Sequence, residues 1–222
     1  KGKNNQVRAL ENVNLTIEPE EWVVVFGPSG CGKSTLLNAI AGLETPTKGE
    51  VRVSGKNIYN LSSDEKSKYR RQKIGMVFQA FHLINSLKVV DNVCLPQLFV
   101  KDSNQDRKKK ALFFLDRFGI KEQFDKYPNN ISGGQKQKVS IARALMNDPE
   151  IILADEPTGN LDSVSKYNVM TILKELNRID KKTIVMVTHD QNNLKYADKI
   201  VHVKDGKIFK VEVIRKKNRT PE

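Results

Sequence analysis

The feature that most constrains this sequence is the run at residues 27–35, G-P-S-G-C-G-K-S-T, which matches the pattern G-x-x-x-x-G-K-S/T. An apolar run, Val23–Phe26, precedes it, and a stretch with helical spacing, Ser34–Ala41, follows. A loop between a buried strand and a helix presents several backbone N–H groups at one point, where the helix dipole also favours negative charge. In this pattern Lys33 reaches the β- and γ-phosphates, and the Ser34 hydroxyl contacts Mg²⁺. This phosphate loop therefore predicts binding of a nucleoside triphosphate.

The rest of the chain predicts an α/β fold around that loop. Two further apolar runs, Ile151–Ala154 and Thr183–Val187, have the length and composition of parallel strands that are covered on both faces. Helical spacing follows each of them, most clearly over Ser163–Ile179. Strands that alternate with helices predict a mainly parallel sheet. No apolar run approaches the about 20 residues that a membrane-spanning helix needs.

Two regions depart from this regularity. Val13–Ile17 and Val51–Val53 alternate apolar and polar residues, which predicts half-exposed antiparallel strands. Residues 80–147 are mainly helical in pattern and include a helix that Asp106 caps and Gly119 ends.

We therefore expect a P-loop NTPase core with an N-terminal antiparallel β subdomain and an inserted α-helical subdomain. The core with its β subdomain spans residues 1–79 and 148–222, and the helical subdomain spans residues 80–147. Together they make a single domain of 222 residues.

Polar side chains follow the other predicted strands. Asp155 and Glu156 end the strand that begins at Ile151, and ligands of an open α/β sheet bind at the carboxyl ends of its strands. Asp155 suits the Mg²⁺ shell, and Glu156 suits polarising an attacking water. The plain alternative is an acidic strand end exposed to solvent. Gln79 and His189 also fall at strand ends, where an isolated Gln or His is more often an ordinary surface or core residue.

Residues 131–135, I-S-G-G-Q, resemble the signature motif of the ABC (ATP-binding cassette) ATPases. The resemblance covers essentially the whole chain and keeps the family's order of motifs: phosphate loop, Gln79, signature, Asp155-Glu156, the G-N-L-D loop at residues 159–162, and His189.

Two positions depart from the family pattern. Ile131 stands where the family usually has Leu, and Lys138 stands where it often has Arg, whose planar fork Lys lacks. Within the family, residues 154–163, A-D-E-P-T-G-N-L-D-S, look most like the lipoprotein-release, macrolide-exporter and cell-division ATPases, and antimicrobial-peptide transporter ATPases are similar.

The resemblance implies a site that two chains share. ATP lies between the phosphate loop of one subunit and the signature residues of the other, so a head-to-tail homodimer or pseudo-dimer closes on two ATPs. Gln79 would sense Mg²⁺ and the attacking water, and His189 would contact the γ-phosphate. The expected catalytic residues are Glu156, His189, Gln79 and Lys33, and the expected Mg²⁺ ligands are Ser34, Gln79 and Asp155. The residues expected to bind ATP are Gly27, Pro28, Ser29, Gly30, Cys31, Gly32, Lys33, Ser34, Thr35, Ser132, Gly133, Gly134, Gln135 and Asp162.

The expected function is ATP binding and hydrolysis by a subunit or domain that drives a membrane ABC transporter or mechanotransmission complex. It would work at the cytoplasmic face of the cell membrane through a transmembrane partner. The alternative is a soluble ABC ATPase that acts on nucleic acid or the ribosome, which the net charge of +12 keeps open. Soluble relatives usually join two cassettes or insert a long coiled coil, and this chain shows one motif set, so nucleic acid is not the expected partner. A binding module without turnover is disfavoured because Glu156 and His189 are both present.

Two features allow a plain and a sharper interpretation. In the plain interpretation, the basic run Arg107–Lys110 is a solvated helix face and the basic run Arg215–Arg219 is a frayed tail. In the sharper interpretation, the tail lies against anionic lipid headgroups. Cys31, inside the phosphate loop and near Lys33, is either a reactive thiol or a shielded thiol that fills space.

One expected element is missing. Related cassettes stack adenine on an aromatic residue at the end of a first strand. Here the first aromatic residue is Trp22, whose place on or next to a buried strand keeps it from the base. The segment Lys1–Arg8 contains no Phe, Tyr or Trp. We therefore expect the first strand and the stacking ring to lie upstream of Lys1.

Overall fold

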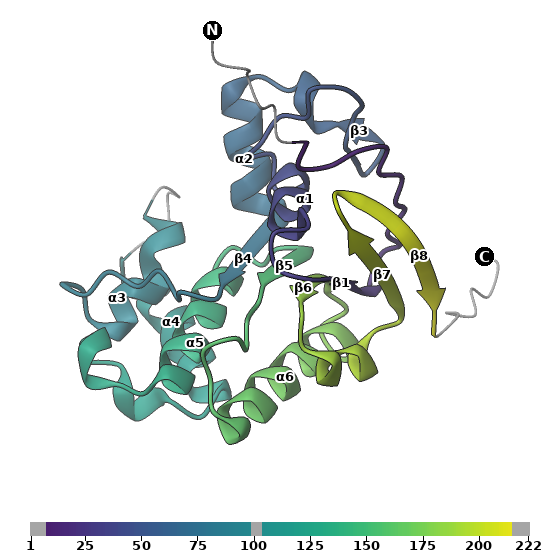
Figure 1. Ribbon diagram of the computed structural model, residues 1–222. Helices are drawn as coiled ribbons and strands as arrows, with labels where there is room; N and C mark the ends of the chain where they lie inside the picture. The colour runs from purple at the N-terminus through teal and green to yellow at the C-terminus, as the bar shows by residue number, and fades with distance from the viewer. Residues whose placement is uncertain (1–7, 99–103, 215–222) are drawn as a thin grey trace, which may run out of the picture.

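The computed structural model describes residues 8–98 and 104–214, and its centre is a six-stranded sheet (Figure 1). Five strands run parallel in the order β4-β5-β6-β1-β7, and β8 lies antiparallel at the edge beside β7. The mainly parallel sheet predicted from the apolar runs is therefore confirmed. The strands are β1 (Trp22–Phe26), β4 (Ile74–Phe78), β5 (Ile151–Asp155), β6 (Thr183–Thr188), β7 (Lys199–Lys204) and β8 (Lys207–Val213).

Helices cover both faces of this sheet. Within the described residues they are α1 (Lys33–Ile40), α2 (Ser63–Lys73), α3 (Val89–Cys94), α4 (Asn104–Arg117), α5 (Gly133–Leu145) and α6 (Ser163–Arg178). Short 3₁₀ helices lie at Ile58–Asn60, Leu95–Gln97, Lys121–Gln123, Pro128–Asn130 and Gln191–Tyr196.

Successive side chains of β1 enter two separate hydrophobic cores. Val23 and Val25 pack with residues of α1 and α2, whereas Trp22 and Val24 pack with residues of α3 to α6. This division follows from the alternation of side chains along a strand. Since both faces are covered, β1 is apolar throughout, and the phosphate loop begins directly after it.

Helices dominate residues 80–147, the range predicted to be mainly helical. This range contains α3, α4 and α5, which Figure 1 shows together beyond the β4 edge of the sheet. The capping role predicted for Asp106 is wrong, because α4 begins at Asn104 and Asp106 lies in its first turn, where its charge still suits the helix dipole. Gly119 follows the helix with a φ of 65°, as a helix-ending glycine should.

The antiparallel part is smaller than predicted. Val51 lies outside the strand pair, which consists of β2 (Arg52–Val53) and β3 (Lys56–Asn57). The strand predicted at Val13–Ile17 is wrong: the segment is in no strand, although its side chains alternate between half-buried and exposed. Alternation reports which side chains face the core, and a strand also needs a neighbouring backbone edge, which no described segment offers here.

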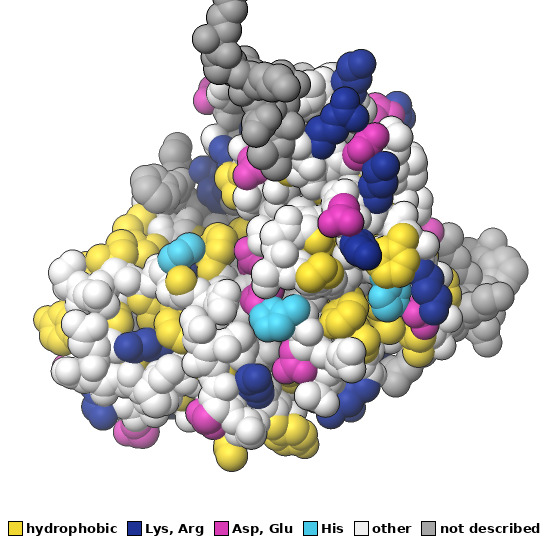
Figure 2. Space-filling view, in the orientation of Figure 1, with side chains coloured by type: hydrophobic (Ala, Val, Ile, Leu, Met, Phe, Trp, Pro, Cys, Tyr) yellow, Lys and Arg dark blue, Asp and Glu magenta, His cyan; other side chains and the backbone are white. Residues whose placement is uncertain are grey.

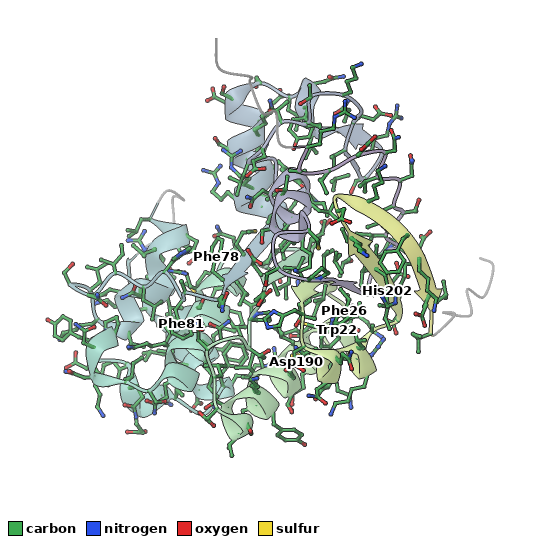
Figure 3. The ribbon with its side chains drawn as sticks, in the orientation of Figure 1. Trp22, Phe26, Phe78, Phe81, Asp190 and His202 are labelled. Carbon is green, nitrogen blue, oxygen red and sulfur yellow. The ribbon has the colours of Figure 1, made fainter. Side chains whose placement is uncertain are left out.

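Trp22, labelled in Figure 3, is completely buried. Its ring stacks on that of Tyr196, with the ring centroids 5.5 Å apart. The prediction that this ring is not available to a bound base is therefore confirmed. The predicted polar segment before the phosphate loop, Lys1–Arg8, lies outside the described residues except for Arg8, and the basic run Arg215–Arg219 lies outside them entirely. In the described part of the chain, no helix combines the length and the apolar character needed to cross a bilayer.

Candidate nucleotide site

The phosphate loop follows β1 and depends on glycine at two close approaches. A Cβ at Gly27 would lie 2.2 Å from the carbonyl oxygen of Val203, which no side chain tolerates. Gly32 has a φ of 98° and is the N-cap of α1, and a Cβ there would lie 2.2 Å from the carbonyl oxygen of Ala9. Because glycine accepts these positions, the backbone turns tightly and enters the helix at Lys33.

Lys33 points back into the loop that it follows. Its Nζ donates hydrogen bonds to the carbonyl oxygens of Gly27 at 2.9 Å and Pro28 at 2.8 Å, and the side chain is only 5% exposed. An ammonium group has three N–H donors. These two bonds leave one donor for an anion bound in the loop.

Ser34 and Asp155 come together at the ends of two elements. The Ser34 hydroxyl on α1 lies 3.1 Å from Asp155 Oδ1 at the end of β5. Burial raises the pKa of Asp155, and the hydrogen bond from Ser34 acts in the opposite direction. A hydroxyl and a carboxylate side by side are oxygen ligands of the type that Mg²⁺ prefers. No cluster of three or more His, Cys, Asp or Glu side chains suited to a metal exists among the described residues, so Mg²⁺ there would need ligands from water and phosphate.

Glu156 and His189 form a close pair. Glu156 Oε2 lies 2.7 Å from His189 Nδ1, and the residues follow the adjacent strands β5 and β6. Glu156 has a φ of 45°, a conformation that is uncommon for a residue with a side chain and that clusters at functional sites. Its backbone N–H donates to the Val187 carbonyl at 3.1 Å, which holds the turn in place.

Gln79 follows β4 and reaches the loop after β5. Its Nε2 donates to Asn160 Oδ1 at 3.2 Å, and a Cβ at Gly159 would lie 2.6 Å from that same nitrogen. Gly159 therefore allows the glutamine to cross to Asn160.

The signature residues form the start of α5. Ser132 is the N-cap, accepting from the Gln135 N–H at 3.3 Å, while Gln135 Oε1 accepts from the Ser132 N–H at 2.9 Å. A Cβ at Gly134 would lie 2.4 Å from Ser165 Oγ on α6. Asp162 caps α6 by accepting from the Ser165 N–H at 2.9 Å, and this bond lowers the pKa of Asp162. The predicted position of the signature at a helix N-terminus is confirmed.

A small pocket opens beside the Glu156–His189 pair. It has a volume of about 280 Å³ and is lined by Glu156, Thr158, Gly159, Lys166, Thr188, His189, Asp190 and Gln191. Figure 2 shows histidine and carboxylate side chains close together near the middle of this face.

The predicted site residues fall into two groups. The phosphate loop, Asp155, Glu156, Gln79 and His189 lie at the carboxyl ends of adjacent strands. The signature residues begin α5, which packs on β4, α3, α4 and α6, whereas α1 packs on β5 and β6. Within one chain, the N-terminus of α1 and the N-terminus of α5 thus belong to helices that pack against different elements.

Some residues of the site escaped prediction. Asn193, 5% exposed, donates to the hydroxyl oxygens of both Thr158 and Thr188 at 3.2 Å, and so joins the loops after β5 and β6. Asn160 lies in the G-N-L-D loop, but no spacing rule pairs it with Gln79. The Cys31 side chain is 5% exposed and belongs to a hydrophobic core, which favours the shielded thiol over the reactive one.

A protein-family profile described as ABC transporter matches residues 10–159. The chain belongs to the ABC transporter family. An uncharacterized ABC transporter ATP-binding protein of Methanocaldococcus jannaschii, MJ1508, is 51% identical over 208 residues, which cover 94% of this chain and 92% of that protein. The macrolide export ATP-binding/permease protein MacB of a Shewanella species is 43% identical over 217 residues, covering 98% of this chain and 33% of MacB.

Solved structures agree with this assignment. The ATP-binding cassette MJ0796, in a dimeric post-hydrolysis state bound to ADP and phosphate, has a TM-score of 0.90 and 45% identity, covering 97% of this chain and 95% of that one. The chain is therefore an ATPase cassette of the ABC transporter family, as predicted, and the similar cassette MJ0796 is dimeric. Macrolide exporters are among the expected relatives that were found, and the alternative of an ATPase acting on nucleic acid gains no support.

Proposed function

We propose that Glu156 is the residue that polarises the attacking water and that Lys33 holds the phosphates. The observation that carries this is the convergence of the phosphate loop, Asp155 and Glu156 at one edge of the parallel sheet. His189, now bonded to Glu156, contacts the γ-phosphate when ATP is bound. This contact releases the carboxylate for the water.

We propose Ser34, Asp155 and Gln79 as the side chains that hold Mg²⁺. Mg²⁺ neutralises charge on the β- and γ-phosphates when it is bound. The Ser34 hydroxyl and Asp155 carboxylate are already 3.1 Å apart, and Gln79 faces the loop that follows Asp155.

The ATP-binding surface is shared between two chains. The N-terminus of α1 and that of α5 are separate anion-binding positions within one chain, and a head-to-tail pair brings one of each to both ATPs. The residues that we propose contact ATP are residues 27–35, residues 132–135 and Asp162.

We place the cassette at the cytoplasmic face of the membrane, bound to a transmembrane partner. We also propose two subdomains, a core at residues 1–79 and 148–222 and a helical part at residues 80–147. The relatives named as transporter ATP-binding proteins support the transmembrane partner, and the grouping of α3 to α5 beyond the β4 edge supports the division into subdomains.

Glu156→Gln tests the assignment of the base. The amide cannot take up the water's proton, so hydrolysis should fall at least about 100-fold, the lower end of what general base catalysis contributes. ATP binding should persist, and the variant should accumulate as a dimer with ATP. Steady-state phosphate release and size-exclusion chromatography with Mg-ATP measure the two outcomes. Hydrolysis near the parent rate would show that Glu156 is not the base.

A further inference from the structure

The turn after Gln79 has an unusual backbone. Two consecutive residues, Phe81 with a φ of 60° and His82 with a φ of 48°, lie in the left-handed region. Residues with side chains rarely adopt this conformation, and they keep it only where surrounding groups hold them. The turn therefore depends on contacts outside itself.

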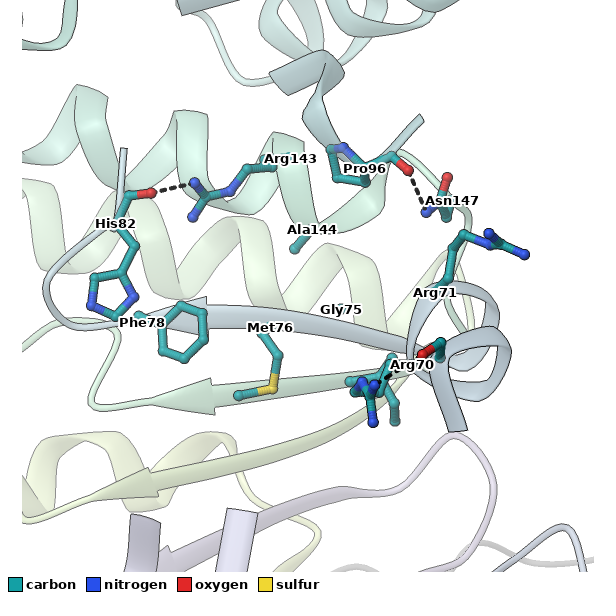
Figure 4. A pocket seen from close by; sticks show the side chains of 12 residues that line it. Arg70, Arg71, Gly75, Met76, Phe78, His82, Pro96, Arg143, Ala144 and Asn147 are labelled. Atoms are coloured by element: carbon teal, nitrogen blue, oxygen red, sulfur yellow. Dashed lines mark hydrogen bonds between the residues drawn. The ribbon is translucent and has the colours of Figure 1, made fainter. Parts of the chain in front are cut away.

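Arg143 on α5 supplies those contacts. Its Nη2 donates to the Phe81 carbonyl at 2.7 Å, and its Nη1 donates to the His82 carbonyl (Figure 4). The guanidinium group is planar and presents its donors in a fixed fork, which fits two successive carbonyl oxygens. Burial lowers the pKa of Arg143, because the charged guanidinium group has lost part of its hydration.

The turn lies between two parts of the nucleotide site. On one side, Gln79 bonds to Asn160 at 3.2 Å. On the other side, the Phe81 ring lies 4.0 Å from the position that a Cβ would take at Gly133 in the signature. Arg143, on the signature helix itself, thus fastens the turn to the element that carries Gly133.

The next part of the loop is fastened to the helical insertion as well. Asn92 on α3 is completely buried, accepts from the Ile84 N–H at 2.8 Å and donates to the Ile84 carbonyl at 3.0 Å. Arg143 and Asn92 together attach residues 81–84 to the helices, which leaves Gln79 and Ala80 as the connection to β4.

We propose that Arg143 is a positioning residue that sets the placement of Gln79 relative to the signature residues of the same chain. This inference rests on the proposed function, because that function gives Gln79 and Ser132 their roles. In a head-to-tail dimer, Gln79 serves the ATP on its own phosphate loop, and Ser132 serves the ATP on the partner's loop. The Arg143 fork therefore links the two ATP sites through one short turn.

The test compares four versions of this chain: the parent, Arg143→Lys, Arg143→Met and Lys138→Met. Lys138 is the matched control, since it lies on the same helix and its Nζ also donates to a backbone carbonyl, that of Phe118 at 2.9 Å, away from Gln79. Arg143→Met should lower kcat about tenfold or more, because small misplacements of catalytic groups have effects of this size. The Hill coefficient for ATP should also fall towards one, while ATP affinity without Mg²⁺ stays unchanged. Arg143→Lys should be intermediate, and Lys138→Met should keep the parent's kcat and Hill coefficient.

Hydrogen exchange of the folded, nucleotide-free proteins gives a second readout. Amides of residues 79–84 should exchange faster in both Arg143 variants and at the parent rate in Lys138→Met. Parent-like kcat, Hill coefficient and exchange in Arg143→Lys and Arg143→Met would overturn the proposal, and so would an equal fall of kcat in Lys138→Met. If Arg143→Met does not fold, Arg143→Lys decides alone, because it keeps the charge and loses the fork. Failure of the proposed function shows separately, as hydrolysis by Glu156→Gln at the parent rate.

Discussion

At the scale of single residues, the charged side chain of Lys33 is held in position within the phosphate loop by hydrogen bonds. The ammonium group is nearly buried, and the carbonyls of Gly27 and Pro28 hold it within the phosphate loop. Burial of an ammonium group is unfavourable unless hydrogen bonds satisfy it. The loop therefore fixes the charge before any phosphate arrives.

Lys33→Ala should weaken ATP binding roughly 10- to 100-fold, since a hydrogen bond to a charged group contributes about 1.5–3 kcal/mol. Titration calorimetry at fixed salt measures the affinity. Lys68→Ala, an exposed change of equal charge on α2, is the control and should bind ATP like the parent. Unchanged affinity in Lys33→Ala would contradict the role given to this side chain.

Contacts between motifs at neighbouring strand ends were predictable, and contacts made by residues outside the motifs were not. Ser34 and Asp155 meet as the sequence predicts, because parallel strands bring their carboxyl ends to one edge. The bonds of Arg143 to the turn at Phe81 join segments 62 positions apart, and no periodicity or spacing signals such a contact. The left-handed φ of Phe81 could not be predicted from the sequence either, because bulky residues such as Phe rarely adopt a positive φ.

At the scale of elements, one buried carboxylate joins β1, α6 and the start of β7. Asp198 is 1% exposed, and its Oδ2 accepts from the Trp22 N–H at 2.9 Å. Arg178 on α6 donates to both carboxylate oxygens, at 3.0 and 2.7 Å. The pair fixes α6 against the sheet near the end remote from the nucleotide site.

Arg178→Met should destabilise the fold by about 3–5 kcal/mol, the usual effect of leaving a buried charge without its partner. Denaturant unfolding, with slopes compared between variants, measures this change. Arg52→Met removes an exposed pair with Glu50 and should leave the midpoint unchanged. ATP affinity of folded Arg178→Met should match the parent, because no phosphate-loop residue touches the pair. A midpoint equal to the parent's would show that Asp198 does not depend on Arg178.

Elements with strong patterns were predicted well, and marginal ones were not. The helix predicted at Ser163–Ile179 ends one residue earlier, and the predicted strand at Thr183–Val187 extends to Thr188. The helix rests on helical spacing over a long stretch, and the strand rests on a short apolar run rich in β-branched residues. Val13–Ile17 has the side-chain alternation of a strand, yet strand pairing depends on a partner segment that local sequence does not reveal.

At the scale of the whole molecule, the net charge of +12 indicated an anionic partner without saying which. In the run at Arg107–Lys110, Lys108 and Lys109 are exposed, while Arg107 is half-buried. Basic and acidic side chains are interspersed on the face that Figure 2 shows. Motif order and relatives, not charge, identify the chain as a member of the ABC transporter family.

The proposal that two chains share each ATP can be tested with a pair of variants. Lys33→Ala disables a phosphate loop, and Ser132→Arg disables a signature by placing a bulky cation at the α5 N-terminus, so each variant alone should lack hydrolysis. A mixed dimer joins the intact loop of one chain to the intact signature of the other.

Mixing the two variants should therefore restore ATPase activity, to roughly a quarter of the parent's, because half of randomly formed pairs are mixed and each has one intact site. Phosphate release measured against the mixing ratio should peak at equal amounts. The control is a mixture of Lys33→Ala with Lys33→Met, which has no intact loop and should stay inactive. A site contained within one chain would give no recovery at any ratio, because each chain would keep its own defect. Recovery that peaks at equal amounts would thus show that ATP lies between the phosphate loop of one cassette and Ser132 of the other.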